Sequence, residues 1–133
     1  MTTLTTPLCR RLGLEVPIIQ APVGSAAAPE LVAAVSDAGG LGVLALTWLT
    51  ERQAQRHIQR VRRLTSRPFG ANLVLDFPIA GRIAVCLDEG VPIISTFWGD
   101  PAGVHPQIHA AGAVHLHTVG SVDEARRAAD AGV

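Results

Sequence analysis

Asp37-Ala38-Gly39-Gly40-Leu41-Gly42-Val43 joins a helix-like segment to an apolar run, and the chain repeats this pattern three more times. The repeats stand at Asp88-Glu89-Gly90, at Ala110-Ala111-Gly112 and at Asp130-Ala131-Gly132-Val133. Glycine tolerates the left-handed conformation that closes a helix, and the apolar run after it predicts a buried strand. The sequence therefore predicts an α/β architecture, and the last repeat predicts a further strand beyond residue 133.

Composition excludes several classes of function. The 133 residues are 48% hydrophobic and 17% charged, which is typical of a domain with many buried strands. The net charge is zero, so nothing favours nucleic acid or an anionic membrane as a partner. All eleven basic residues are Arg, which excludes a Schiff-base lysine and a P-loop lysine.

Three features favour a cytoplasmic protein. No apolar run approaches the about 20 residues of a membrane span. The segment Met1–Pro7 lacks the basic start and apolar core of a signal peptide. Cys9 and Cys86 are too few and too far apart for a disulfide framework, so we expect two free thiols in a reducing compartment.

Apolar runs and helix signals alternate along the chain. We expect strands at residues 16–22, 41–46, 68–75, 92–97 and 114–119. We expect helices at residues 29–38, 50–64, 79–89, 100–111 and 121–131. Capping boxes at Thr50-Glu51-Arg52-Gln53 and Ser121-Val122-Asp123-Glu124 support the second and fifth helices, whereas Gly103 and Pro106 weaken the fourth.

Helical spacing predicts which faces of the first two helices are buried. In the first helix the expected buried residues are Leu31, Ala34, Val35 and Ala38. In the second they are Ala54, Ile58, Val61 and Leu64. The arginines at positions 52, 56, 60 and 63 lie on the other side of that helix, and we interpret them as a solvated face.

Strict alternation with short connections predicts a parallel sheet flanked by helices. A doubly wound open sheet and a (β/α)8 barrel both satisfy this pattern. No Gly-rich dinucleotide motif follows the first strand, and a strand spacing of about 25 residues is typical of barrel units. A barrel needs eight strands and usually about 250 residues, so this chain would supply only the first five βα units.

In parallel α/β folds, ligands gather at the carboxyl ends of the strands. These ends carry Ala21-Pro22-Val23-Gly24, Thr47-Trp48, Asn72, Thr96-Phe97-Trp98-Gly99 and His117-Thr118. Asn72 is an amide within an apolar strand. A buried amide without partners costs about 1–3 kcal/mol, so Asn72 either bonds locally or serves a ligand. Gly24 would let a ligand approach the backbone closely.

The histidines allow several interpretations. His115 and His117 alternate on one face of the fifth expected strand. Two histidines at this spacing can bind a metal, but no third ligand is evident, so we expect no metal site. The alternatives are a histidine that lines a pocket and a histidine that is hydrogen-bonded within the structure. His57, His105 and His109 receive no role.

Five short motifs occur in order along the whole chain. They are Thr5-Thr6-Pro7-Leu8-Cys9, Pro17-Ile18-Ile19-Gln20-Ala21-Pro22, Ala38-Gly39-Gly40-Leu41-Gly42-Val43-Leu44, Arg67-Pro68-Phe69-Gly70-Ala71-Asn72-Leu73 and Val119-Gly120-Ser121-Val122-Asp123-Glu124-Ala125. Together they resemble the nitronate monooxygenase family, formerly called 2-nitropropane dioxygenase. The FMN-dependent enoyl-ACP reductases are close relatives of that family. The resemblance implies a TIM barrel of the (β/α)8 type, with residues 1–133 as one partial barrel domain that ends before the sixth strand.

The resemblance also implies where FMN binds. The loop Ala21, Pro22, Val23 and Gly24 would touch the flavin ring, Asn72 would hydrogen-bond it, and His117 and Thr118 would line its site. The catalytic histidine of the family lies in the next strand, beyond residue 133, so no catalytic residue is assigned here. The loops that hold the FMN phosphate also come later in the family, which predicts weak FMN retention by this chain.

The implied activity is oxidation of an alkyl nitronate or nitroalkane by an FMN-dependent oxidoreductase with O2. The alternatives are an enzyme similar to the FMN-dependent enoyl-ACP reductases and a catalytically inactive barrel fragment. Such a fragment would have two exposed sheet edges, and an exposed edge is a template for self-association.

Overall fold

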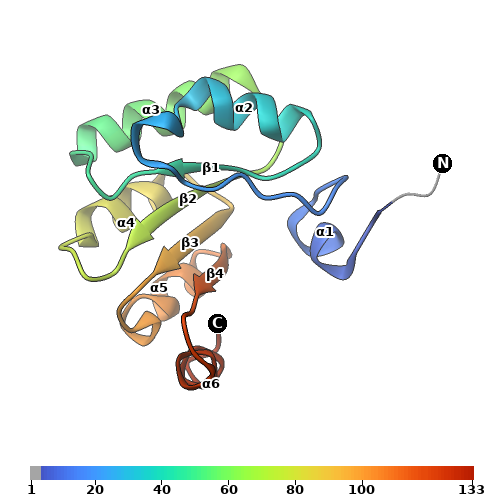
Figure 1. Cartoon of the computed structure of the whole chain (residues 1–133). Helices are drawn as coiled ribbons and strands as arrows, with labels where there is room; N and C mark the ends of the chain where they lie inside the picture. The colour runs from blue at the N-terminus through green and yellow to red at the C-terminus, as the bar shows by residue number, and fades with distance from the viewer. Residues whose placement is uncertain (1–3) are drawn as a thin grey trace.

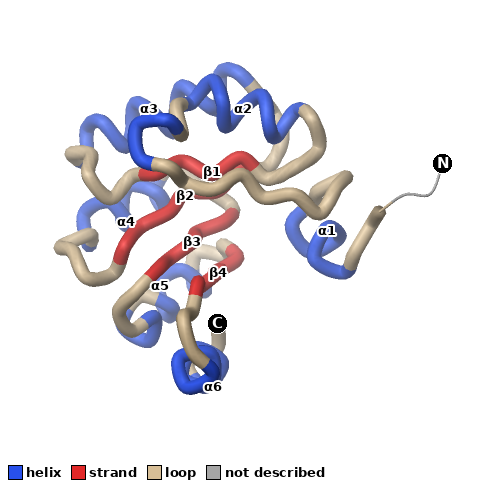
Figure 2. The backbone as a smooth tube through the Cα atoms, in the orientation of Figure 1, coloured by secondary structure: helices blue, strands red, loops and turns tan. Residues whose placement is uncertain are grey.

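The computed structural model describes residues 4–133 and contains a four-stranded parallel sheet with the strand order β1-β2-β3-β4. The strands are β1 (Gly42–Ala45), β2 (Phe69–Val74), β3 (Ile93–Phe97) and β4 (Val114–Thr118). The helices are α1 (Pro7–Leu12), α2 (Pro29–Asp37), α3 (Glu51–Leu64), α4 (Ala80–Asp88), α5 (His105–Ala110) and α6 (Val122–Asp130). Two short 3-10 helices, η1 (Gly24–Ala26) and η2 (Pro101–Gly103), complete the elements. Figures 1 and 2 show the four strands side by side, with α1 beyond the end where the strands begin.

The two faces of the sheet have different coverings. On the outer face, side chains such as Leu44, Leu73 and Ile94 pack against α2, α3, α4 and α5 in the main apolar core. On the inner face, Val43 and Ile93 pack against Cys9, Leu12 and Leu14 of α1 and the segment after it. Because neighbouring residues in the register point to the same side, Asn72 and Ser95 also belong to the inner face.

The first predicted strand is wrong as a strand. Residues 16–22 contribute only one isolated parallel bridge, between Ile19 and Leu41. Pro17 and Pro22 have no N–H to donate to a ladder. The side chain of Gln20 bonds both backbone groups of Val43, accepting from the N–H at 3.1 Å and donating to the oxygen at 3.3 Å. The segment also bonds the backbone of Leu41, whose N–H donates to the oxygen of Ile18 and whose oxygen accepts from the N–H of Gln20, both at 2.9 Å. It therefore runs beside β1 without forming a strand, and the described part of the chain has four strands instead of the expected five.

Helix α1 lies outside every predicted helix. The side chain of Thr6 caps it by accepting from the N–H of Cys9, Pro7 occupies its first turn, and Gly13 closes it at φ 72°. These are ordinary start and stop signals, so the sequence contained the information that identifies this helix. The helix buries Cys9 and Leu12 against the amino end of the inner face.

The buried face predicted for α2 is also wrong. Val32, Ala33 and Ser36 are buried, whereas Leu31 is 43% exposed. The cause is the close approach of α2 to β1. The hydroxyl of Ser36 accepts a hydrogen bond from the N–H of Gly42 at 3.3 Å, and this contact turns Ser36 towards the sheet.

Helix α3 follows its prediction closely. Its residues Ala54, Ile58 and Val61 are fully buried, and the arginines at positions 52, 56, 60 and 63 are exposed. Arg60 reaches across to α2 and pairs with Glu30 at 3.0 Å. Leu64 is the exception, because it is 37% exposed at the last turn of the helix. None of the helices in residues 4–133 is both long and apolar enough to cross a membrane.

Thr50 is expected to stabilise α3 measurably. Its side chain accepts from the N–H of Gln53, and the Gln53 side chain accepts from the N–H of Thr50, which completes a capping box. We expect Thr50→Ala to lower the free energy of unfolding by about 1 kcal/mol, as measured by urea denaturation. Thr50→Ser keeps the hydroxyl and should stay close to wild type. An equal loss in both variants would contradict the capping role.

Candidate functional site

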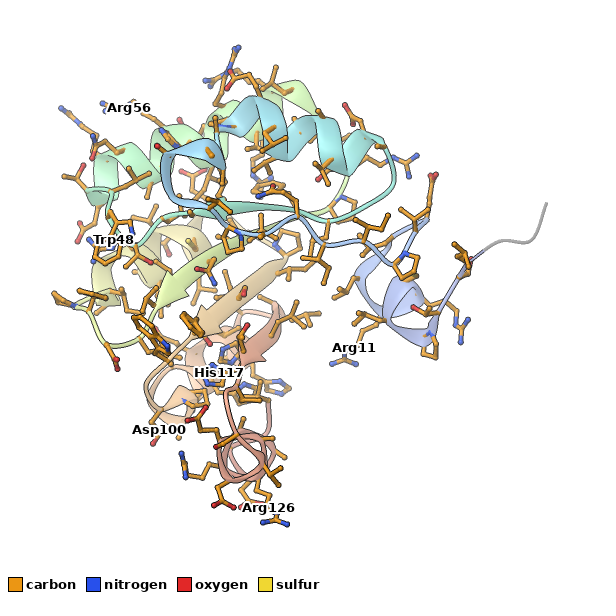
Figure 3. The ribbon with its side chains drawn as sticks, viewed as in Figure 1. Arg11, Trp48, Arg56, Asp100, His117 and Arg126 are labelled. Atoms are coloured by element: carbon orange, nitrogen blue, oxygen red, sulfur yellow. The ribbon has the colours of Figure 1, made fainter. Side chains whose placement is uncertain are left out.

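The inner face of the sheet opens into a pocket at the carboxyl ends of the strands. Its volume is about 620 Å³. The pocket is lined by Ile19, Pro22, Val43, Trp48, Asn72, Val74, Ser95, Phe97, Trp98, Leu116, His117 and Thr118. Figure 3 shows Trp48 and His117 at this edge, on segments that are distant in the sequence. The lining is mostly apolar, with four polar side chains among it, which is typical of a small-molecule site.

Asn72 is the most constrained polar group of this pocket. It is only 8% exposed, and its side-chain amide donates to Ser95, at 3.1 Å to the hydroxyl and 3.3 Å to the backbone oxygen. Within residues 4–133, its Oδ1 accepts no hydrogen bond. The side-chain N–H group of Asn72 is therefore hydrogen-bonded within the structure, which is one of the two expected interpretations. Its Oδ1 acceptor is left facing the pocket. Ser95 was not predicted, because the register that sets it opposite Asn72 is fixed only by the packed sheet.

The structure separates the other residues expected at the site into two groups. Pro22, His117 and Thr118 line the pocket together with Asn72. Gly24 lines a neighbouring hollow of about 380 Å³, together with Ala45, Trp48 and His57. Ala21 and Val23 are exposed and are part of neither lining. The reason is that the loop after residue 20 turns into η1 and carries these side chains away from the inner face.

The histidines form a chain of close contacts on the outer face of β4. The hydroxyl of Thr96 lies 2.7 Å from His115 Nε2 and 2.8 Å from His117 Nδ1. His115 Nδ1 lies 3.1 Å from Nδ1 of His105, a residue to which we had given no role. Burial, and then the charges of His105 and His117, lower the pKa of His115 to about 4. His115 is therefore a hydrogen-bonded, neutral structural histidine at neutral pH.

His117 occupies the pocket end of this chain of contacts. Partial burial lowers its pKa, while the negative charges of Glu124 and Asp100 oppose that shift. Among residues 4–133, no three His, Cys, Asp or Glu side chains are grouped as a metal site requires. His117 therefore contacts Thr96 on the outer side of β4, at the strand end that borders the pocket.

Cys9 and Cys86 are free thiols, and both are buried. Burial raises the pKa of the Cys86 thiol to about 12, which leaves it protonated and unreactive. Cys9 packs in the apolar cluster on the inner face, away from the carboxyl edge. Neither thiol takes part in the pocket.

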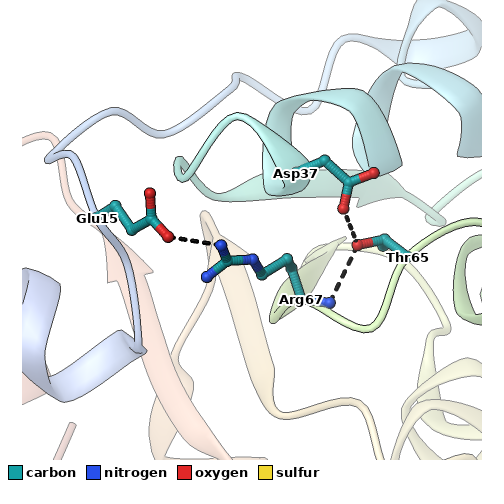
Figure 4. A network of polar contacts seen from close by, with 4 residues as sticks. All are labelled: Glu15, Asp37, Thr65 and Arg67. Carbon is teal, nitrogen blue, oxygen red and sulfur yellow. Dashed lines mark hydrogen bonds and ion pairs between the residues drawn. The ribbon is translucent and has the colours of Figure 1, made fainter.

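A second hollow, of about 690 Å³, lies at the opposite, amino end of the strands. Arg10, Arg11, Arg62 and Arg67 are among the residues that line it. Figure 4 shows the polar network beside it, in which Arg67 pairs with Glu15 at 2.6 Å and the Thr65 hydroxyl donates to Asp37. The network joins the ends of α2 and α3 to the segment after α1. We interpret this network as structural, because ligands of parallel α/β folds bind at the carboxyl ends of the strands.

Comparison with known proteins agrees with this architecture. The family model described as nitronate monooxygenase matches residues 5–81. A "(3aS,4S,5R,7aS)-5-hydroxy-7a-methyl-1-oxo-octahydro-1H-indene-4-carboxyl-CoA dehydrogenase" of Mycobacterium tuberculosis is 35% identical over 127 residues, which are 95% of this chain and 36% of that protein. A nitronate monooxygenase of Pseudomonas aeruginosa is 39% identical over 101 residues, which are 74% of this chain and 29% of that protein.

A solved structure gives the same result for the fold. FabK of Thermotoga maritima superposes with a TM-score of 0.95 at 31% identity, over 98% of this chain and 42% of that one. The chain thus spans 29% to 42% of the length of these three proteins, and its sheet is part of a TIM barrel. With a family model that matches more than half of its residues, the chain belongs to the nitronate monooxygenase family of oxidoreductases.

Proposed function

We propose that residues 1–133 act as one partial barrel domain that holds the ring of FMN in the carboxyl-end pocket of an oxidoreductase. The observation that carries the proposal is Asn72, a buried amide whose donor is committed to Ser95 and whose acceptor faces the pocket. A flavin ring has an apolar side and a hydrogen-bonding side. A mostly apolar pocket with one oriented amide is complementary to both.

The lining fits the ring of the flavin better than its phosphate. Ile19, Val74 and Leu116 supply apolar surface, and Ser95 and Thr118 supply hydroxyls. No Arg is part of this lining, so the pocket contains no fixed positive charge that would bind a phosphate group. This supports the expectation that the chain binds FMN weakly.

Each residue then has a defined part in the site. Asn72 orients the ring through its amide, and Ser95 holds the amide in place. His117 bonds Thr96 through its Nδ1 and so fixes the end of β4 beside the pocket. When bound, FMN supplies the redox chemistry on which the family depends.

The reaction we propose is oxidation of an alkyl nitronate or nitroalkane with O2, as the family match and the Pseudomonas aeruginosa relative suggest. A second candidate is dehydrogenation of a ring-bearing acyl-CoA. Two observations favour it: the apolar lining of the pocket, and the Mycobacterium tuberculosis relative, which covers 95% of this chain. Oxygen consumption with a nitronate, compared with reduction of a dye by a ring-bearing acyl-CoA, distinguishes the two. Bound FMN with turnover of neither substrate would identify an inactive fragment.

Binding of FMN can be tested with the chain alone. Its two tryptophans, Trp48 and Trp98, both line the pocket, so bound flavin should quench their fluorescence by energy transfer. We expect saturable quenching on titration with FMN, and we expect the cofactor to be lost on gel filtration. Asn72→Ala should weaken FMN affinity about tenfold, because it removes a hydrogen bond from a buried polar site.

The matched control is Gln55→Ala, which removes an exposed amide on α3 that bonds only Glu89. It should leave FMN affinity unchanged. Equal FMN affinity in Asn72→Ala and wild type would overturn the role of Asn72, and unsaturable quenching in wild type would overturn the proposed cofactor site.

A further inference from the structure

Aromatic side chains are unevenly distributed in this molecule. The chain has five Phe and Trp residues and no Tyr. Phe69 is buried in the main core. The other four follow the carboxyl ends of three neighbouring strands: Trp48 after β1, Phe77 after β2, and Phe97 and Trp98 at the end of β3. We call these four residues the aromatic rim.

The rim is exposed although it is apolar. Trp48 is 66% exposed, Trp98 is 55% exposed and Phe77 is 36% exposed. Exposed aromatic surface gathered beside a pocket marks an interaction site more often than a random patch does. Trp48 and Trp98 both line the pocket described above, so their rings border the same space.

Each tryptophan is supported by a phenylalanine. The ring of Trp48 meets Phe77 edge to face, with centroids 4.5 Å apart and an angle of 72° between the planes. The ring of Trp98 lies over Phe97, with centroids 4.6 Å apart and an angle of 31°. Such pairs are mutually attractive and restrict the movement of the rings. The two walls are therefore ordered before any ligand arrives.

The backbone at Trp98 is itself unusual. Trp98 has a φ of 55°, and no other non-glycine residue in residues 4–133 has a positive φ. A bulky side chain in this region is strained, and such strain is concentrated at functional sites. Gly99 follows at φ 63°, and a Cβ on it would lie 2.7 Å from Cβ of Leu75. The turn is thus pressed against the end of β2, and this packing holds the Trp98 ring at the pocket.

We propose that the aromatic rim binds a flat, apolar ring system of the substrate, so that Trp48 and Trp98 select cyclic over linear substrates. The inference rests on the proposed function, because it assigns the rim to the substrate beside the FMN ring, and it favours the second candidate substrate, a ring-bearing acyl-CoA. Aromatic rings at one pocket favour a flat ring, which can stack on them, over a flexible alkyl chain, which loses more conformational freedom when it is immobilised. Trp48 and Trp98 are specificity-determining residues in this proposal, with no part in proton or electron transfer.

The test compares two ligands of equal size and charge. Naphthalene-2-carboxylate and undecanoate have the same number of carbon atoms and one carboxylate each, but only the first is a flat ring. Binding to the whole chain is measured by isothermal titration calorimetry. Trp98→Ala and Trp48→Ala should each weaken binding of naphthalene-2-carboxylate about tenfold, which is the effect of removing one aromatic stacking partner. Binding of undecanoate should change less than about twofold, because it does not depend on stacking.

Trp98→Phe and Trp48→Phe are the matched controls, because they keep an aromatic ring at each position. They should retain most of the preference for naphthalene-2-carboxylate. Since both tryptophans are exposed, the alanine variants remove no core residue, and circular dichroism verifies their fold. An equal loss for both ligands would overturn the proposal. A change from dimer to monomer in sedimentation, with ligand binding unchanged, would also overturn it by assigning the rim to a second copy of the chain.

Failure of the rim can be distinguished from failure of the proposed function. FMN titration of the wild-type chain, followed by quenching of its tryptophans, tests the flavin site separately from the rim. If the chain binds FMN but shows no preference between naphthalene-2-carboxylate and undecanoate, the proposed role of the aromatic rim is overturned and the flavin site is not. A preference for naphthalene-2-carboxylate in a chain that does not bind FMN would leave the rim in place and overturn the flavin site.

Discussion

Replacing Gly42 with Ala is expected to lower the free energy of unfolding by about 3–5 kcal/mol, the range of the most damaging single substitutions. A Cβ at this position would lie 2.7 Å from the carbonyl carbon of Val32 and 2.8 Å from its Cα, and closer still to its oxygen. These are backbone atoms of α2, which cannot rotate away as a side chain can. The helix would have to move off β1, and Val32 would leave the core.

Urea denaturation of the wild type and of the Gly42→Ala variant measures this loss of stability. Gly103→Ala is the matched control, because a Cβ on Gly103 would meet no atom within 4 Å and its φ is not positive. That variant should stay within about 0.5 kcal/mol of wild type. A Gly42→Ala protein as stable as the Gly103→Ala protein would show that α2 does not approach β1 as closely as described.

Stability should fall in acid through His115. Burial, followed by the charges of His105 and His117, lowers the pKa of His115 from 6.5 to about 4 in the folded chain. Above pH 6.5 the residue is neutral in both states and contributes no pH dependence. As the pH falls from 6.5 to 4, the unfolded chain gains a proton that the folded chain does not bind, so unfolding becomes easier. The full loss is about 3 kcal/mol and is complete below about pH 4.

The contribution of His115 can be isolated by difference. Carboxylates also titrate in this range, and Glu30 is one of them, since its hydrogen bond to Arg60 lowers its pKa. The free energy of unfolding of His115→Gln should therefore be subtracted from that of wild type at each pH. The difference should decrease between pH 6.5 and 4. A flat difference for His115→Gln would contradict its burial as a neutral group.

Much of the fold could be predicted because its signals are local. Strands β1 to β4 lie within the predicted runs, and α3 begins at the predicted capping box. Gly39, Gly90 and Gly112 have positive φ, as expected for residues that close helices. The positions of Asn72, His117 and Thr118 at the pocket follow from the same alternation, since parallel strands end at one edge of the sheet.

The remaining features depend on distances between elements. The side chain of Gln20 extends the backbone contact of residues 18–20 by bonding Val43, and no local signal reports a partner that lies 23 residues away. The contact between His105 and His115 depends on how α5 packs on β4. The placement of Ala21 and Val23 outside the pocket depends on the turn into η1.

The sequence by itself determined the order of β1 to β4 and of α2 to α6, and the place of Asn72, His117 and Thr118 at the carboxyl edge, because backbone propensity and periodicity act between near neighbours. Only the tertiary structure decided which face of α2 is buried. It also decided that the Oδ1 atom of Asn72 is left for a ligand and that Trp48 and Trp98 border one pocket. The physical reason is the same in each case. These properties depend on the separation and register of elements that pack together, and for α2 and β1 that separation is set by the missing side chain of Gly42.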